Sequence, residues 1–371
     1  MTAISWFGFP LRSHTVPSLP VVSALIAAGA DVTFYTSDRY RPMVEASGAR
    51  VVSYPAICEE IERGKDLRTH VRDVLDVSRA IAPSLVASNR SADVVVFDAS
   101  AFWGRIVARE RGVPSASSVT TFVFTRAMLQ LMARSTPMSD EDADVLATAG
   151  DLKIAYTSQS FQPAGRFLDD THLFVGPLLE SRPRDGVRVE PEGSRPLAYV
   201  SLGTLFNDNV ALLRRIASQL SSAGWQVVVS LGASGARADG EWPPHVRAYP
   251  FVDQLGVLAH ARLVVSHGGL QTVTESLALG VPLIIIPQGV DQHVVAQRAA
   301  GLGAALVLDE QTATGEAFVA ALARIDAERS RFESAAEAIG RGFADSTLTP
   351  LATAVQRLLD LPVTAAARRA T

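Results

Sequence analysis

The feature of this sequence that most limits its fold is the alternation of short, almost wholly apolar runs with longer segments of helical pattern. Apolar runs with few polar residues on either face are typical of strands in a parallel sheet that helices cover on both sides. A helix over residues 21–28, ended by Gly29, follows the first run, and a polar helical stretch precedes the fourth. The apolar runs of the first third of the chain are residues 3–9, 31–37, 51–55 and 93–99.

A second series of the same kind begins near residue 197. Its apolar runs are residues 197–203, 225–232, 245–251, 262–268, 282–288 and 304–309, with helical segments between them. Two such series predict an α/β protein with two doubly wound, Rossmann-like domains.

The stretch between the two series is rich in proline, glycine and charge, which is typical of an interdomain linker. We therefore expect an N-terminal domain over residues 1–178, a linker over 179–196 and a C-terminal domain over 197–345. The remaining residues, 346–371, have a helical pattern with leucines and valine on one face, and we expect this helix to pack back on the first domain.

Composition excludes several classes of protein. The net charge of −4 provides no basic excess for a dedicated nucleic-acid binder. The single cysteine, Cys58, excludes an intramolecular disulfide framework and a multi-cysteine metal site. No apolar run has the length that spans a bilayer. Residues 16–30 could be mistaken for a signal peptide, but they lack a basic start, and we expect a cytoplasmic protein.

The loops that follow the strands carry the residues with chemical potential, because doubly wound sheets bind ligands at the carboxyl ends of their strands. In the C-terminal half, SLGT (201–204) and HGGLQT (267–272) each lead into a helix. Their glycines permit close backbone approach, and the free N–H groups of a helix N-terminus attract anions. Two such ends, near 207–209 and 272–274, suit a diphosphate; the alternative is that they are ordinary tight turns. His267 adds a donor, and Glu275, expected in the first turn of its helix, could accept hydrogen bonds from ribose hydroxyls.

In the N-terminal half, His14 and Asp98 both lie at the ends of predicted strands. A histidine held by a carboxylate keeps one tautomer and can take a proton from a hydroxyl group. Taken separately, His14 could be an ordinary polar loop residue and Asp98 a helix N-cap.

Residues 251–298 resemble the donor-binding signature of the family 1 glycosyltransferases, in the bacterial antibiotic and macrolide branch with its HGG-x-x-T variant. Looser matches extend the resemblance along the chain: HTVP (14–17), FDASAFWG (97–104), VGP (175–177) and SLGT (201–204). The resemblance implies a GT-B fold, with two Rossmann-like domains that face each other across a cleft.

The resemblance also implies roles for individual residues. His14 matches the base that deprotonates the acceptor, and Asp98 matches its carboxylate partner. The nucleotide-sugar donor is expected to contact Gly203, Thr204, Phe251, Gln254, His267, Gly268, Gly269, Thr272, Glu275, Asp291 and Gln292. Three positions depart from the family pattern: Phe251 replaces a tryptophan, Asp253 replaces a proline, and Val295 stands where an asparagine commonly follows the Asp-Gln pair.

The mechanism that follows is a single displacement that inverts the anomeric centre of a dTDP- or UDP-linked sugar, with transfer to a hydroxyl group. No metal is expected, because helix N-termini can neutralise the diphosphate. Asp140, Asp142 and Asp144 have the D-x-D spacing that a metal-dependent transferase would use, but they lie in an acidic run that is more typical of a solvated loop or helix start.

The acceptor is expected to bind the N-terminal half. Residues 120–132 are rich in Phe, Met and Leu, which favours either a core stripe or an apolar acceptor pocket formed by Phe122, Phe124, Met128 and Met132. In the second case the acceptor is an apolar natural product. A homodimer is possible.

Three other functions compete with transfer. A dehydrogenase would need a G-x-G-x-x-G fingerprint after its first strand, and FPLRSH stands there instead. A sugar-nucleotide epimerase would share the fold and the phosphate loops. A non-catalytic, nucleotide-sugar-binding partner of another transferase would tend to lack His14, His267 or the Asp291–Gln292 pair, all of which are present.

Overall fold

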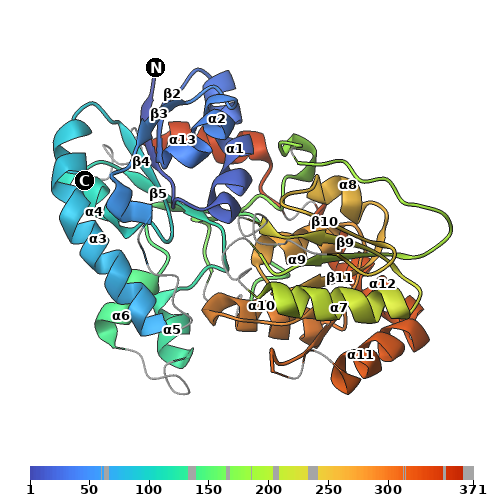
Figure 1. Ribbon diagram of the computed structural model, residues 1–371. Coiled ribbons are helices and arrows are strands. Elements are labelled where there is room, and N and C mark those ends of the chain that lie inside the picture. Colours follow the sequence, from blue (N-terminus) through green and yellow to red (C-terminus); the bar gives the residue numbers. More distant parts are fainter. Residues whose placement is uncertain are drawn as a thin grey trace. The chain divides into compact units, whose positions relative to one another are not determined.

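The computed structural model divides the chain into two compact units (Figure 1). Residues 1–182 and 346–371 form the first unit, and residues 183–345 form the second. The structure describes residues 1–59, 61, 67–132, 139–163, 168–184, 186–203, 209–232, 241–311, 313, 315–345 and 348–361.

The first unit is built on a seven-stranded sheet whose order is β3-β2-β1-β4-β5-β6-β7, with every neighbouring pair parallel. Its strands are β1 (Ala3–Phe7), β2 (Asp31–Thr36), β3 (Arg50–Ser53), β4 (Val94–Asp98), β5 (Ser115–Val119), β6 (Leu152–Ala155) and β7 (His172–Phe174). Its helices are α1 (Arg12–Ala27), α2 (Arg41–Glu45), α3 (Leu67–Ser88), α4 (Phe102–Arg111), α5 (Arg126–Met132), α6 (Asp140–Leu146) and α13 (Leu351–Leu359), with short 3-10 turns at Asp38–Tyr40, Ala56–Glu59 and Leu179–Ser181.

Both faces of this sheet are buried, and the strand period of two sorts the side chains between them. Trp6 of β1 and Val96 of β4 face a core that α1, α2 and α13 complete. Phe7 and Phe97 face the other way, where Gly104 of α4 packs so closely that a Cβ atom on it would lie 2.5 Å from the Cβ of Phe97. Figure 1 shows α1, α2 and α13 on one side of the sheet and α3 and α4 on the other.

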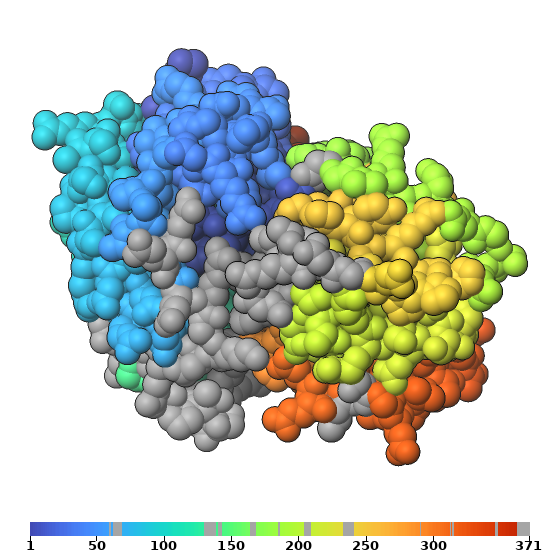
Figure 2. Space-filling model, in the orientation of Figure 1, coloured from blue at the N-terminus to red at the C-terminus, as the bar shows by residue number. Residues whose placement is uncertain are grey.

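The second unit has a six-stranded sheet of the same topology, β10-β9-β8-β11-β12-β13, and its neighbouring strands are also parallel. Its strands are β8 (Leu197–Ser201), β9 (Gln226–Ser230), β10 (Val246–Tyr249), β11 (Ala261–Ser266), β12 (Leu283–Ile285) and β13 (Ala305–Val307). Its helices are α7 (Val210–Ser222), α8 (Gln254–Leu258), α9 (Leu270–Ala278), α10 (Val290–Gly301), α11 (Glu316–Ala327) and α12 (Arg329–Gly342). On the face drawn in Figure 2, the surface of this unit is formed by segments coloured yellow-green, gold and orange, which come from different parts of its sequence.

The strand order locates the place in each unit where a ligand should bind. In each sheet the chain first builds outward in one direction and then returns to the centre to build in the other, so the order reverses between β1 and β4 and between β8 and β11. Loops at such a switch point separate and leave room for a ligand beside the carboxyl ends of the two strands.

Three sequence-based expectations need correction. The first helix begins at Arg12, not Val21, so His14 lies in its first turn and not in a loop. Pro17 and Pro20 lie inside this helix, where a proline costs about 3 kcal/mol. Because Val16 and Leu19 are buried against the sheet core, tertiary packing offsets that cost.

The second correction concerns strands β5, β6 and β7, which the apolar pattern does not predict. The sequence of β5 is Ser-Ala-Ser-Ser-Val, which has little of the β-branched and aromatic character of a strand. It is nevertheless buried because β4 and β6 flank it.

The third correction concerns the linker, part of which is docked on the second unit. Val187 forms a parallel bridge with Val252, and Arg184 forms an ion pair of 3.1 Å with Asp253. The second unit therefore begins at residue 183, ahead of the expected boundary at 197.

The final helix behaves as its apolar face suggests. Val355 and Leu358 of α13 are buried in the core of the first unit, beside residues of α1. Among the described residues, no helix has the combination of length and apolar character that crossing a membrane requires.

Candidate functional site

The switch point of the first unit brings together His14, from the first turn of α1, and Asp98, the last residue of β4. The Nδ1 atom of His14 lies 3.0 and 3.1 Å from the two carboxylate oxygens of Asp98. The side chain of Asp98 is 2% exposed and that of His14 is 14% exposed. A carboxylate this close to Nδ1 favours the tautomer with the proton on Nδ1, which places the basic lone pair on Nε2.

Two further groups complete the hydrogen bonding of the buried carboxylate. The backbone N–H of Ser100 donates to Asp98 Oδ1 at 2.8 Å, and the hydroxyl of Thr120 donates to Oδ2 at 3.3 Å. Burying a charge is costly unless such donors surround it. Sequence reasoning assigned no role to Thr120, although the strand-end rule would have pointed to it if β5 had been recognised.

An aromatic cluster supports the His14 ring. The ring of Phe9 lies 5.2 Å from that of His14 and stacks at 5.9 Å on Trp103, whose indole N–H donates to the hydroxyl of Tyr54. His70 lies at the edge of the Phe9 ring. Burial lowers the pKa of His70, and repulsion from His14 when that ring is protonated lowers it further.

The four candidate acceptor residues have different environments. Phe122 is 1% exposed and packs on Phe161 at 5.6 Å, and Met128 is 5% exposed, so both have the burial of core residues. Phe124 is half-buried and retains an accessible face. The side chain of Met132 lies outside the described part of the chain.

In the second unit, two glycine-containing loops at the switch point surround the His267 ring. Gly203 follows β8 and Gly268 follows β11, and their φ angles of 87° and 92° favour glycine. A Cβ atom on Gly203 would lie 2.6 Å from His267 Nε2, and one on Gly269 would lie 2.8 Å from the same atom. Thr204 lies outside the described residues.

His267 is a neutral histidine with an unused ring nitrogen. Burial lowers its pKa from 6.5 to about 4, partly offset by a hydrogen bond with the backbone of Ser201. Its Nδ1 atom is buried and has no hydrogen-bond partner among the described residues. The neutral ring has a single N–H, and with one nitrogen bonded to the Ser201 backbone it adds no positive charge to the site at neutral pH.

The N-terminus of α9 begins directly after these loops. Gly269 is the N-cap and provides no side-chain cap, so the first N–H groups of the helix have no side-chain partner there. Thr272 lies in the first turn, but Glu275 lies in the second turn, one turn deeper than we expected from the sequence.

Glu275 belongs to a buried polar network. Its side chain is 2% exposed and accepts hydrogen bonds from the amides of Gln254 and Gln271. The hydroxyl of Tyr199 donates to the Gln254 carbonyl oxygen at 2.9 Å. Gln254 and Glu275 are therefore held as a pair. Phe251, two residues past β10, is half-buried.

Two of the three positions that depart from the family pattern, Asp253 and Val295, have structural explanations. Asp253 caps α8 by accepting from the Gly256 N–H, in addition to its ion pair with Arg184. Val295 is completely buried in the core beneath α10.

The side-chain oxygen of Gln292 accepts from the backbone N–H groups of Gln288 and Gly289. This oxygen therefore holds the loop, and only the side-chain amide nitrogen of Gln292 is left for a sugar. Asp291 lies partly buried in the first turn of α10.

No group of three or more metal-binding side chains occurs among the residues that the structure describes. In the acidic run, Asp144 forms an ion pair with Arg126, and the side chains of Asp140 and Asp142 lie outside the described part.

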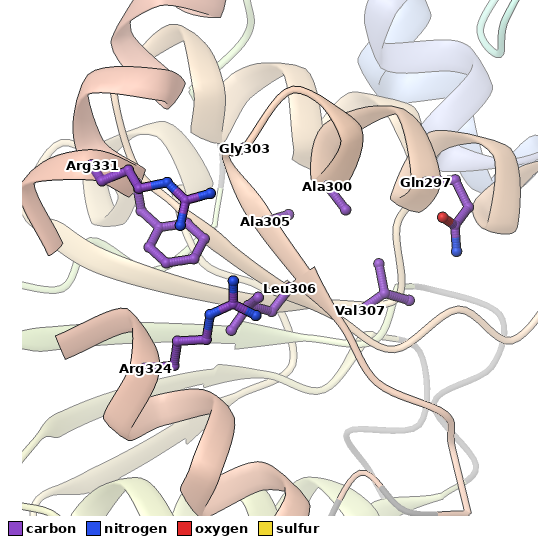
Figure 3. A pocket seen from close by; sticks show the side chains of 9 residues that line it. Gln297, Ala300, Gly303, Ala305, Leu306, Val307, Arg324 and Arg331 are labelled. Atoms are coloured by element: carbon purple, nitrogen blue, oxygen red, sulfur yellow. The ribbon is translucent and has the colours of Figure 1, made fainter. Parts of the chain in front are cut away.

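A separate hollow of about 260 Å³ lies at the edge strand β13, and none of its lining residues belongs to the loops above. The side chains of Arg324 and Arg331 extend toward it from α11 and α12 (Figure 3). Both arginines form ion pairs with Glu328, so one carboxylate already offsets part of their charge.

Comparison with known proteins shows which family the chain resembles. Residues 212–348 match the family described as "Glycosyltransferase family 28 C-terminal domain". The chain is 30% identical over 345 residues to demethyllactenocin mycarosyltransferase of Streptomyces fradiae, covering 81% of this chain and 74% of that protein.

Two solved structures are similar in fold over nearly the whole chain. The calicheamicin glycosyltransferase CalG4 has a TM-score of 0.77 with 25% identity, and the match covers 100% of both chains. The glycosyltransferase VinC in complex with dTDP has a TM-score of 0.72 with 23% identity, covering 98% of this chain and 100% of that one.

Proposed function

Because the chain belongs to the family of antibiotic and macrolide glycosyltransferases, we propose that it moves a sugar from dTDP or UDP to a hydroxyl group of an apolar natural product. It is a glycosyltransferase with the GT-B fold, and its membership of this family favours transfer over the dehydrogenase, epimerase and non-catalytic partner alternatives. The observation that most supports transfer to a hydroxyl group is the pairing of His14 with Asp98 at the switch point of the first unit.

His14 is proposed as the base that activates the acceptor. With Nδ1–H directed at Asp98, Nε2 can take the proton of an attacking hydroxyl group, and the carboxylate stabilises the imidazolium that forms. General-base catalysis of this kind contributes roughly 10²–10⁴-fold in rate. The aromatic side chains around His14 are buried and support its ring, so Phe124 is the described acceptor candidate with an accessible face.

The loops after β8 and β11 are proposed to hold the diphosphate of the donor. The first N–H groups of α9 can stabilise the negative charge that develops on the leaving group, and the His267 ring lies beside the N-cap residue Gly269. The VinC complex with dTDP supports a thymidine donor for this chain. The paired Gln254 and Glu275 are positioned for the nucleoside, and Asp291 with the Gln292 amide for the sugar.

The proposed reaction is a single displacement. The acceptor oxygen forms a bond to the anomeric carbon as the bond from that carbon to the diphosphate oxygen breaks, so the anomeric configuration inverts. The acceptor proton goes to His14 Nε2, and the nucleoside diphosphate leaves with the electron pair.

The experiment begins with a thermal-shift panel of dTDP, UDP and ADP, which shows whether the second unit prefers a pyrimidine diphosphate. dTDP- and UDP-sugars are then incubated with polyketide and aromatic aglycones, and products are analysed by mass spectrometry and by NMR of the anomeric proton. We expect an inverted glycoside on a hydroxyl group. Activity only on free sugars or peptides, or a product with retained configuration, would contradict the proposal.

A further inference from the structure

The strongest unassigned feature of the first unit is the hydroxyl group of Thr120, which follows β5 beside the His14–Asp98 pair. Its Oγ1 atom lies 2.8 Å from His14 Nδ1, closer than either carboxylate oxygen of Asp98. The same atom lies 3.3 Å from Asp98 Oδ2. Thr120 is 8% exposed, so water cannot readily replace these contacts.

A count of protons shows how these three groups can be satisfied together. Asp98, when ionised, only accepts, so the single hydroxyl proton of Thr120 goes to Asp98 Oδ2. The lone pairs on Thr120 Oγ1 then face Nδ1, and the Nδ1–H of His14 is shared between the carboxylate and the hydroxyl oxygen. Removal of the hydroxyl would take away the shortest of the three contacts made to Nδ1 by Asp98 and Thr120.

We propose that Thr120 is a positioning residue that, with Asp98, fixes the ring orientation and the Nδ1–H tautomer of His14. This inference rests on the proposed function, because it gives the tautomer a purpose: only that form presents a basic Nε2 to the acceptor. Thr120 acts through His14 and is not itself required to contact the reacting atoms.

The test compares three variants. Thr120→Val keeps the shape of the side chain and removes the hydroxyl, and Thr120→Ser restores it. Thr121→Val is the matched control, because the Thr121 hydroxyl donates to the backbone carbonyl of Phe122. We expect Thr120→Val to lower kcat roughly tenfold, as the loss of one buried hydrogen bond does, with the donor KM unchanged. Thr120→Ser should recover most of the rate, and Thr121→Val should behave as the wild type.

A second readout needs no activity. In protein labelled with ¹⁵N-histidine, the two ring nitrogens of His14 are identified by their absence from the His14→Ala spectrum. We expect the free wild-type enzyme to show the Nδ1–H tautomer, Thr120→Val to show ring shifts displaced toward those of a tautomer mixture, and Thr120→Ser to restore them.

The outcomes separate the two ideas. If His14→Ala leaves turnover unchanged, the proposed base is wrong whatever Thr120 does. If His14→Ala abolishes turnover but Thr120→Val matches Thr121→Val in kcat and in the His14 shifts, only the role of Thr120 is overturned. A raised donor KM with unchanged kcat and unchanged shifts would also overturn it, because Thr120 would then contact the donor and not position the histidine.

Discussion

Lowering the pH should destabilise the second unit through His267. Burial holds the pKa of this histidine at about 4 in the folded protein, against 6.5 for an ordinary histidine. At pH values between 4 and 6.5 the unfolded chain binds a proton on His267 that the folded unit does not bind. The free energy of unfolding therefore rises with pH over this range, and the contribution of His267 to stability is lost as the pH falls from 6.5 through 4. From pH 7 to pH 5 this one group should cost the unit about 2 kcal/mol, given a folded pKa of about 4.

The assay is amide hydrogen exchange measured by mass spectrometry at pH 7 and pH 5, corrected for the intrinsic exchange rates. Peptides from β8, β9 and β11 report the unfolding free energy of the second unit, and peptides from β1 and β4 serve as the internal control. The comparison protein is His267→Gln, which removes the titrating group and keeps a side chain that can donate a hydrogen bond.

We expect the pH-dependent loss in the second-unit peptides to be smaller in His267→Gln by about 2 kcal/mol. The peptides of the first unit should behave alike in both proteins, because His70, whose pKa is also lowered, is unchanged between them. An identical pH dependence of the second unit in the two proteins would refute the assignment of a buried, neutral His267.

The remaining predictions concern transfer and nucleotide binding. His14→Ala should reduce kcat at least about 100-fold. Asp98→Asn should reduce kcat by roughly 10- to 100-fold, because an amide cannot stabilise the imidazolium as a carboxylate does. Near-normal rates in a quenched-flow or endpoint product assay would contradict both. Gly269→Ala places a Cβ atom 2.8 Å from His267 Nε2. This variant should bind dTDP or UDP at least about tenfold more weakly in calorimetry. Gly301→Ala is the matched control and should bind normally, because a Cβ atom there meets nothing within 4 Å. Dialysis against EDTA should leave the rate within about twofold of its starting value, because helix N-termini take the place of a cation at the diphosphate; a loss restored by Mg²⁺ or Mn²⁺ would contradict this.

The strand-end rule located most of the candidate site from the sequence. Apolar runs predicted β1, β4, β8 and β11; Asp98 is the last residue of β4, and His14, Gly203 and His267 follow the other three strands. The rule works because it depends on local pattern alone: a run of apolar residues fixes where a buried strand ends, and parallel strands end at one edge of a sheet.

Hydrogen-bond partners were harder to predict. Glu275 and Gln254 contact each other, and the Gln292 oxygen is bound by its own loop, although the motif alone suggested that all three face the donor. Thr120 was missed because the strand before it consists mainly of serine. Phe122 and Met128 fit either a pocket or a core until their burial is known.

The sequence by itself therefore determined the class of fold, the number of sheets and the strand ends where chemistry could occur, because these depend on the periodicity of neighbouring residues. Only the tertiary structure decided that Asp98 and Thr120, 84 and 106 residues from His14, share its Nδ1 atom. Those contacts arise from the order in which the strands pair. Strand order depends on packing between segments that lie far apart in the sequence, and the local pattern of residues does not reveal which segments pack together.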